Sequence, residues 1–203
     1  MYRWTRDLHL YLGLFVSPFV LLFAVSVLFL NHAKVDTDDW TSVATVQDLE
    51  IPDGIAGAVG PAAVARAQAI LRQLGITGEV GFTTITARTG RFGFPVLKPG
   101  LELRIDVDLS ARSATVSRRI TTFWEALAYL HKMPGPHNLA IRGNWIGTRA
   151  WGWLADATVF LLLFLTVSGI YLWYAIRAER RIGVALLTAG AVSFFGLIYV
   201  VIR

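Results

Sequence analysis

Three long apolar runs constrain the fold of this chain more than any other feature of its sequence. They cover about residues 8–30, 157–176 and 182–202, and none of them contains an acidic or basic side chain other than histidine. Each is close to the ~20 residues that a helix needs to cross about 30 Å of hydrocarbon at 1.5 Å per residue. A helix pairs its own backbone N–H and C=O groups, which find no water inside a bilayer. Each run is therefore predicted to be a transmembrane helix.

A cleaved signal peptide is the alternative interpretation of the first run. Arg3 and Arg6 make a basic start, and Ala24-Val25-Ser26 resembles a small-residue cleavage site. The apolar stretch is nevertheless longer than the 7–15 residues of a usual signal-peptide core. We therefore expect a retained membrane anchor.

Basic residues in the short segments beside the runs predict the orientation, because such segments stay in the cytoplasm. Arg3 and Arg6 flank the first run, and arginines fill the turn at 177–181 between the second and the third. The amino terminus and this turn are therefore expected inside, with residues 33–149 and the carboxyl terminus outside. The expected location is a bacterial inner (cytoplasmic) membrane, with the main domain periplasmic or extracytoplasmic.

The expected fold class is a membrane protein with three transmembrane α-helices and a small extracytoplasmic α+β domain. Because the chain has no cysteine, that domain cannot contain disulfides, Cys-bound zinc or a catalytic thiol, and packing must hold it together. The predicted boundaries are 1–32 for the first helix, 33–149 for the outer domain with its tether and pre-membrane helix, 150–176 for the second helix, 177–181 for the cytoplasmic turn and 182–203 for the third helix.

The basic balance of the chain indicates membrane topology and gives no reason to expect nucleic acid as a partner. The formal net charge is +5, but residues 33–149 hold 13 basic and 11 acidic side chains, which leaves that segment at only 13 − 11 = +2. The expected partners are membrane lipid and other membrane-protein subunits or further copies of the chain.

The outer segment alternates helical and strand patterns. Gly60-Pro61 opens a helical pattern that ends at Gly75, with proline at a favourable first-turn position. Residues 80–86 and 91–97 are predicted as short strands. Residues 101–109 alternate strictly between apolar and polar, which predicts a strand with one buried and one wet face.

The two ends of this segment are less regular. Residues 36–53 are acidic and turn-rich and are expected to form a tether, and residues 114–117 are expected to add an edge strand. Residues 121–133 return to helix, with Thr122 and Glu125 at the spacing of a capping box. One helix on a small antiparallel sheet is the expected α+β unit.

Four short motifs resemble the PepSY-associated transmembrane helix family. DLHLYLGL at 7–14 resembles the family's LHRxLGL opening, and LFLNH at 28–32 resembles its LLLNH exit from the first helix. The Leu-His pair at 130–131 resembles the LH that precedes the family's second membrane helix. TVSGIYLW at 166–173 resembles the LTSGxxLW end of that helix. The resemblance implies a PepSY-like outer domain, a module also found in peptidase propeptides. Larger relatives, proposed as ferric or siderophore reductases, have a fourth spanning helix and more membrane histidines.

The four histidines are candidate ligands, because imidazole is a common axial ligand of haem and ionisable groups at membrane depth are functional candidates. The topology places His32 and His131 at the same outer level, so these two are the predicted ligands of a b-type haem. His137 is a substitute. The alternative interpretation is that these rings contact headgroups, water or backbone carbonyls at the membrane boundary.

The inner side restricts electron transfer across the membrane. His9 is the only histidine expected near the cytoplasmic face, since the second and third runs contain none. A second haem would need a partner subunit to supply the other ligand. No further metal site is predicted.

Asp156 and a row of small residues complete the candidates. Asp156 is expected near the amino end of the second helix, where the helix dipole favours a carboxylate, with a proton relay as the alternative. Ala185, Ala189 and Ser193 recur every fourth residue along the third run, which favours close packing against another helix.

Three functions remain open. An accessory or scaffolding subunit of a larger bacterial membrane complex is favoured, and a b-haem redox component or a regulator of a secreted peptidase are the alternatives. The sequence contains no His-Glu zinc-helix motif, nucleophile elbow or phosphate-binding glycine loop, so no catalytic residue is predicted and an enzyme acting alone is disfavoured.

Overall fold

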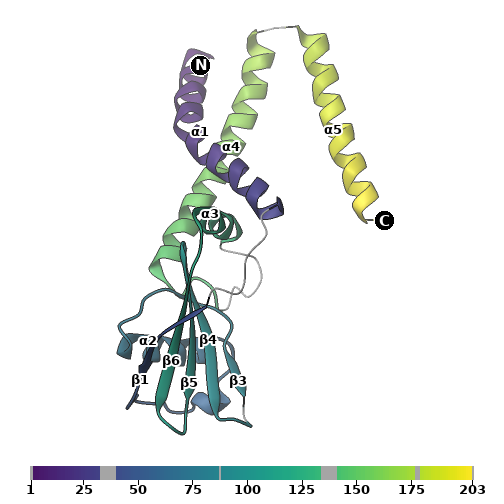
Figure 1. Ribbon diagram of the computed structural model, residues 1–203. Helices are drawn as coiled ribbons and strands as arrows, with labels where there is room; N and C mark the ends of the chain where they lie inside the picture. Colours follow the sequence, from purple (N-terminus) through teal and green to yellow (C-terminus); the bar gives the residue numbers. More distant parts are fainter. Residues whose placement is uncertain (1, 33–39, 87, 134–140, 177–178, 203) are drawn as a thin grey trace. The chain divides into compact units, whose positions relative to one another are not determined.

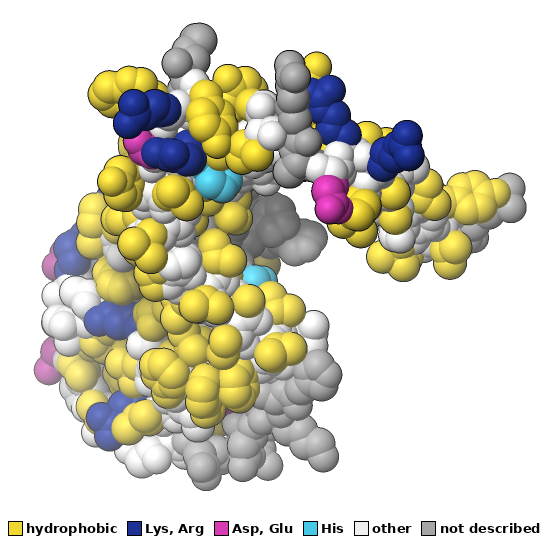
Figure 2. Space-filling model, turned by 90° about the horizontal axis from the view of Figure 1, so that it is seen from above, with side chains coloured by type: hydrophobic (Ala, Val, Ile, Leu, Met, Phe, Trp, Pro, Cys, Tyr) yellow, Lys and Arg dark blue, Asp and Glu magenta, His cyan; other side chains and the backbone are white. Residues whose placement is uncertain are grey.

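The computed structural model describes residues 2–32, 40–86, 88–133, 141–176 and 179–202. Its contacts divide the chain into two compact units, Met1–Phe19 with Ala157–Arg203, and Val20–Asp156. Three helices are long and apolar enough to cross a membrane, as predicted: α1 (Tyr2–His32), α4 (Ile146–Ile176) and α5 (Arg180–Ile202) (Figure 1). Figure 2 shows hydrophobic side chains over much of the visible face of the molecule.

In the first unit, the beginning of α1 packs on the later part of α4. A Cβ added at Gly13 would lie 3.7 Å from the Leu165 side chain, so the two helices approach closely there. Pro18 lies inside α1 and cannot donate to the carbonyl of Leu14. The Ser17 hydroxyl donates to that carbonyl at 2.9 Å instead. This replacement keeps the Leu14 carbonyl paired, as a helix that crosses a membrane requires.

The helix α5 is nearly separate from the rest of its unit. None of its residues is buried. It contacts α4 at Gly183, where an added Cβ would overlap the Trp173 ring, and at Arg180, whose guanidinium lies 4.8 Å from the centre of the Tyr174 ring. A larger residue at 183 would therefore push α5 away from α4.

The second unit contains an antiparallel sheet with the order β1-β6-β5-β4-β2, and β3 pairs with β4 at the same edge as β2. Helix α2 (Gly60–Gln73) covers one face of the sheet (Figure 1). A short 3-10 helix, η1 (Ile55–Gly57), precedes α2. The strands are β1 (Thr41–Val46), β2 (Glu79–Val80), β3 (Thr84–Thr86), β4 (Arg91–Lys98), β5 (Leu101–Asp108) and β6 (Ser113–Ile120).

The register predicted for residues 101–109 is confirmed. Leu103, Ile105 and Val107 are buried in the core under α2, whereas Arg104 and Asp106 are exposed on the opposite face. The rest of the core comes mainly from α2 and β4, including Ile70, Leu71, Phe92, Phe94 and Val96. Alternation along β5 therefore separates a core face from an open polar face.

The tether prediction was wrong for part of its length. Thr41–Val46 forms β1 and pairs with β6, so β6 is an inner strand and β1 is the edge. The run contains two threonines, two valines and no proline or glycine, and its β propensity outweighs the acidic surroundings. Leu49, just beyond it, is 3% exposed and joins the core.

The predicted strand at 80–86 is also divided. Pairing of β2 with β4 ends at Val80, and β3 begins only at Thr84. Between them, Gly81 donates to the carbonyl of Pro95 at 2.9 Å, while Pro95 itself has no N–H for the ladder. The proline in β4 therefore interrupts the pairing.

Helix α3 (Phe123–Lys132) begins with the predicted capping box. Thr122 accepts from the Glu125 N–H, and the Glu125 carboxylate accepts from the Thr122 N–H at 2.7 Å. Arg119 also joins Glu125 to Glu102, with N···O distances of 3.1 and 2.8 Å. Partial burial by itself raises the pKa of Glu125. The contacts with the Thr122 N–H and the Arg119 guanidinium together lower this pKa by more than burial raises it, so the net shift is downward. Ion pairs of Arg119 therefore connect β5 and β6 to the beginning of α3.

Candidate functional site

His131, on α3, bonds to a buried serine of α1. Its Nδ1 lies 2.9 Å from Ser26 Oγ, and Ser26 is 2% exposed. The Ser26 hydroxyl in turn donates to the carbonyl of Phe23 at 2.7 Å. The pair therefore joins α3 to the later part of α1 within the second unit.

These two bonds determine which ring nitrogen carries hydrogen. A serine hydroxyl has one hydrogen, and Ser26 gives it to the Phe23 carbonyl. His131 Nδ1 must then be the donor to Ser26 Oγ. In the neutral ring the lone pair is consequently on Nε2, which is the nitrogen left for a ligand or a proton.

Aromatic side chains fix the ring of His131. The Phe23 ring packs edge-on against it at 5.7 Å between centroids, and Phe23 also packs against Trp151 at 5.7 Å. Trp151 Nε1 donates to the Leu130 carbonyl at 2.8 Å, which joins α4 to α3. The imidazole therefore has a defined orientation.

A second histidine–serine pair lies in the first unit. His9 Nδ1, on α1, lies 2.8 Å from Ser168 Oγ on α4, and Ser168 is 5% exposed. Ser168 Oγ also lies 3.2 Å from the Leu165 carbonyl, and the two bonds form together when His9 Nδ1 is the donor to Ser168. The sequence indicated both histidines as candidate ligands but did not indicate Ser26 or Ser168 as their partners. A serine inside an apolar run was the signal that could have pointed to each of them.

The predicted haem pair remains a prediction. His32 is the last residue of α1, but its side chain lies outside the described residues, as does all of His137. Among the residues that the structure describes, no group of three or more His, Asp or Glu side chains is placed to hold a metal ion.

Glu79 forms a buried polar centre that the sequence did not predict. It is 2% exposed, yet it accepts from Gly143 N at 2.8 Å, from Trp145 N at 3.1 Å and from Thr148 Oγ1 at 2.7 Å. These donors lie at the amino end of α4, where the helix dipole also favours a carboxylate. Glu79 therefore anchors α4 to the edge of the sheet.

Asn144 completes this anchor. Its side-chain amide pairs with both backbone groups of Val80, at 2.9 Å to the N–H and 2.8 Å to the carbonyl, as a neighbouring strand would. The backbone carbonyl of Asn144 accepts from the side-chain amide of Gln68, on α2, at 2.9 Å. The segment before α4 is thus attached to the sheet and to α2 together.

The prediction for Asp156 was wrong in its structural reason. α4 begins at Ile146, ten positions before Asp156. The helix dipole acts strongly only within the first turn, and the Asp156 carboxylate lies beyond it. Asp156 is exposed. The carboxylate at the amino end of this helix is that of Glu79.

A small cavity of about 170 Å³ lies between α3, the end of α1 and one end of the sheet, with Phe29, Leu101, Arg119 and Lys132 in its lining. Tyr129 also lines it, and its buried hydroxyl has no hydrogen-bond partner among the residues that the structure describes. Burial raises the pKa of this hydroxyl above its usual range, so it stays protonated.

Comparison of the chain with known protein families, with curated proteins and with solved structures finds no match.

Proposed function

We propose that this chain is an accessory subunit of a larger bacterial membrane complex. It joins that complex through the small-residue face of α5 and through the open face of its sheet. In this proposal the amino terminus is cytoplasmic and the α+β domain is extracytoplasmic.

The exposure of α5 carries the proposal. Every residue from Arg180 to Ile202 is exposed except Gly183, which is half-buried. Lipid covers an apolar helix as well as protein does, but α5 also has small residues along one side, at Ala185, Ala189 and Ser193. Such rows let helix backbones approach closely and are typical of helix–helix interfaces in membranes. A helix of another subunit is the occupant that fits this face.

The open face of the sheet supports a second contact. Opposite α2, Arg104 and Asp106 are exposed, and the Arg104 guanidinium lies 4.8 Å from the centre of the Trp40 ring. Tryptophan and arginine are enriched at protein interfaces. This polar and aromatic face is suited to a protein partner outside the membrane.

Substitution of Ala189 by Leu tests the α5 interface. The larger side chain should prevent close approach and reduce the amount of complex about five- to thirty-fold, which corresponds to a loss of about 1–2 kcal/mol. The matched control is Ala191→Leu, because Ala191 lies on the opposite side of the helix at 100° per residue. Native gels of membranes solubilised in mild detergent measure the fraction in the complex. Equal behaviour of the two variants, or a wild-type chain that migrates alone, would contradict the proposal.

A b-type haem-binding redox component is the second candidate, and the orientation of His131 favours it. Metal-bound histidines usually donate their other ring N–H to a fixed acceptor, which orients the ring and increases the basicity of the ligating nitrogen. Ser26 is such an acceptor for His131 Nδ1–H, and it leaves Nε2 for iron. His131 therefore fits one axial position, with His32 as the predicted second ligand. His9 would bind only with a ligand from a partner subunit.

The visible spectrum of the purified protein tests the haem proposal. We expect His131→Ala or His32→Ala to abolish a low-spin haem absorbance and His137→Ala to leave most of it. Ser26→Ala should keep the ligand but loosen haem binding by about 10- to 100-fold, because it removes only the acceptor that orients the ring. Wild-type protein without a haem band, or a band that survives His131→Ala, would exclude this candidate.

A further inference from the structure

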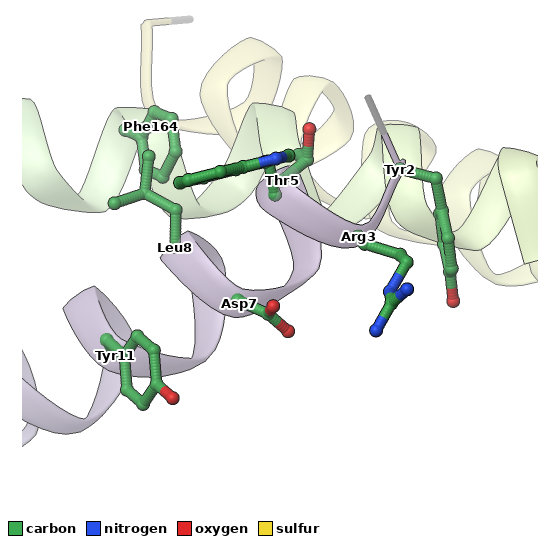
Figure 3. Close-up of a pocket in the computed structure, with 8 residues that line it drawn as sticks. Tyr2, Arg3, Thr5, Asp7, Leu8, Tyr11 and Phe164 are labelled. Atoms are coloured by element: carbon green, nitrogen blue, oxygen red, sulfur yellow. The ribbon is translucent and has the colours of Figure 1, made fainter.

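The first turns of α1 and one residue of α4 enclose an open groove of about 890 Å³ within the first unit. Arg3, Asp7 and Tyr11, spaced four residues apart, point to the same side of α1, whereas Leu8 points toward Phe164 of α4 (Figure 3). The groove therefore has a polar side and an apolar side.

The charges of the polar side are not balanced. Asp7 binds Arg6, with Nη2 and Nε of Arg6 at 2.8 and 2.9 Å from Oδ1. Among the residues that the structure describes, no hydrogen bond or ion pair involves the Arg3 side chain, which is exposed. The guanidinium of Arg3 is thus left to bind an anion.

The groove also lies where an apolar span begins. The uncharged run of α1 starts at Leu8, one turn after Trp4, and Trp4 is 83% exposed. Exposed Trp and Tyr side chains beside a span are typical of the headgroup level of a bilayer. A ligand here would place a polar group beside Arg3 and a hydrocarbon chain beside Leu8 and Phe164.

We propose that this groove binds one anionic phospholipid, with its phosphate on Arg3 and the first part of an acyl chain against Leu8 and Phe164. Guanidinium groups bind phosphate oxygens with two parallel hydrogen bonds. The hydroxyl of Tyr11, on the same side of α1 as Arg3, is a further donor to the headgroup. A zwitterionic lipid fits less well, because its ammonium group would need a carboxylate and Asp7 is already paired with Arg6.

The test uses the full chain in detergent with phosphatidylglycerol, with phosphatidylcholine of the same acyl chains, and with inorganic phosphate. Native mass spectrometry counts the lipids retained, and thermal melting measures stabilisation. We expect phosphatidylglycerol to be retained about five-fold better than phosphatidylcholine, as one basic residue at an anionic surface predicts. Arg3→Gln should remove this preference. Arg181→Gln, which makes the same change of charge in the same unit but outside the groove, should keep it.

Three outcomes would overturn the proposal. The first is equal retention of the two lipids by the wild-type chain. The second is equal loss in Arg3→Gln and Arg181→Gln, which would indicate attraction by net charge alone. The third is full displacement of phosphatidylglycerol by inorganic phosphate, which would indicate a site for free anions. Circular dichroism of both variants should show unchanged helix content, because both side chains are exposed.

Discussion

Replacing Glu79 by Ala should destabilise the second unit by about 3–5 kcal/mol, because several buried donors would lose their acceptor together. The N–H groups of Gly143 and Trp145 and the hydroxyl of Thr148 all bind this carboxylate. For a domain of about 100 residues, such a loss lowers Tm by about 10 °C or more. Thermal melting followed by circular dichroism measures it, and hydrogen exchange should locate the opening at residues 141–148.

Two further variants separate loss of the anchor from loss of charge. Glu79→Gln keeps one acceptor oxygen but turns an NH₂ group toward N–H donors, so it should cost less than Glu79→Ala. Asp106→Ala removes the same charge from the open face, where the side chain is exposed, and should stay within about 0.5 kcal/mol of wild type. A Glu79→Ala protein as stable as Asp106→Ala would show that this carboxylate does not anchor α4.

The anchor also explains what sequence patterns predicted well and what they did not. The long apolar runs and the alternation at 101–109 are patterns that extend over many residues. The runs form helices that are long and apolar enough to cross a membrane, and the alternation places one side of β5 in the core. Glu79 stands in a strand of two residues, and its partners lie 64 to 69 positions further along the chain. No local pattern connects residues so far apart, so the carboxylate at the start of α4 was assigned to Asp156 instead.

For the candidate histidine sites, too, the local sequence indicated the residues but not their long-range partners. Apolar surroundings were enough to identify His9 and His131 as candidates, and their roles in ligation remain predictions. The ring nitrogen that carries hydrogen depends on Ser26 and Ser168, which belong to other helices. The position of β1 was missed for a related reason, since its partner β6 follows about 70 residues later and the intervening elements hide the pairing.

Ile105→Asp should unfold the α+β domain while the apolar helices remain helical. Ile105 is 0% exposed at the centre of β5, between Phe94 on β4 and Val116 on β6. An aspartate there would be buried among apolar side chains without a partner, and it would also remove the packing of the isoleucine against α2. A loss of more than about 4 kcal/mol is expected, which is most of the stability of an ordinary small domain.

Limited proteolysis of the full chain in detergent measures this effect, since cleavage should spread through residues 41–120 in Ile105→Asp. Two controls keep the result specific to burial of the charge. Ile105→Val keeps an apolar side chain and should cost about 0.5–1.5 kcal/mol. Ser117→Asp places the same carboxylate on the open face, directly opposite Arg104, where a cross-strand pair of opposite charge is tolerated. Protease resistance in Ile105→Asp equal to that of Ser117→Asp would mean that the odd-numbered side of β5 does not face the core.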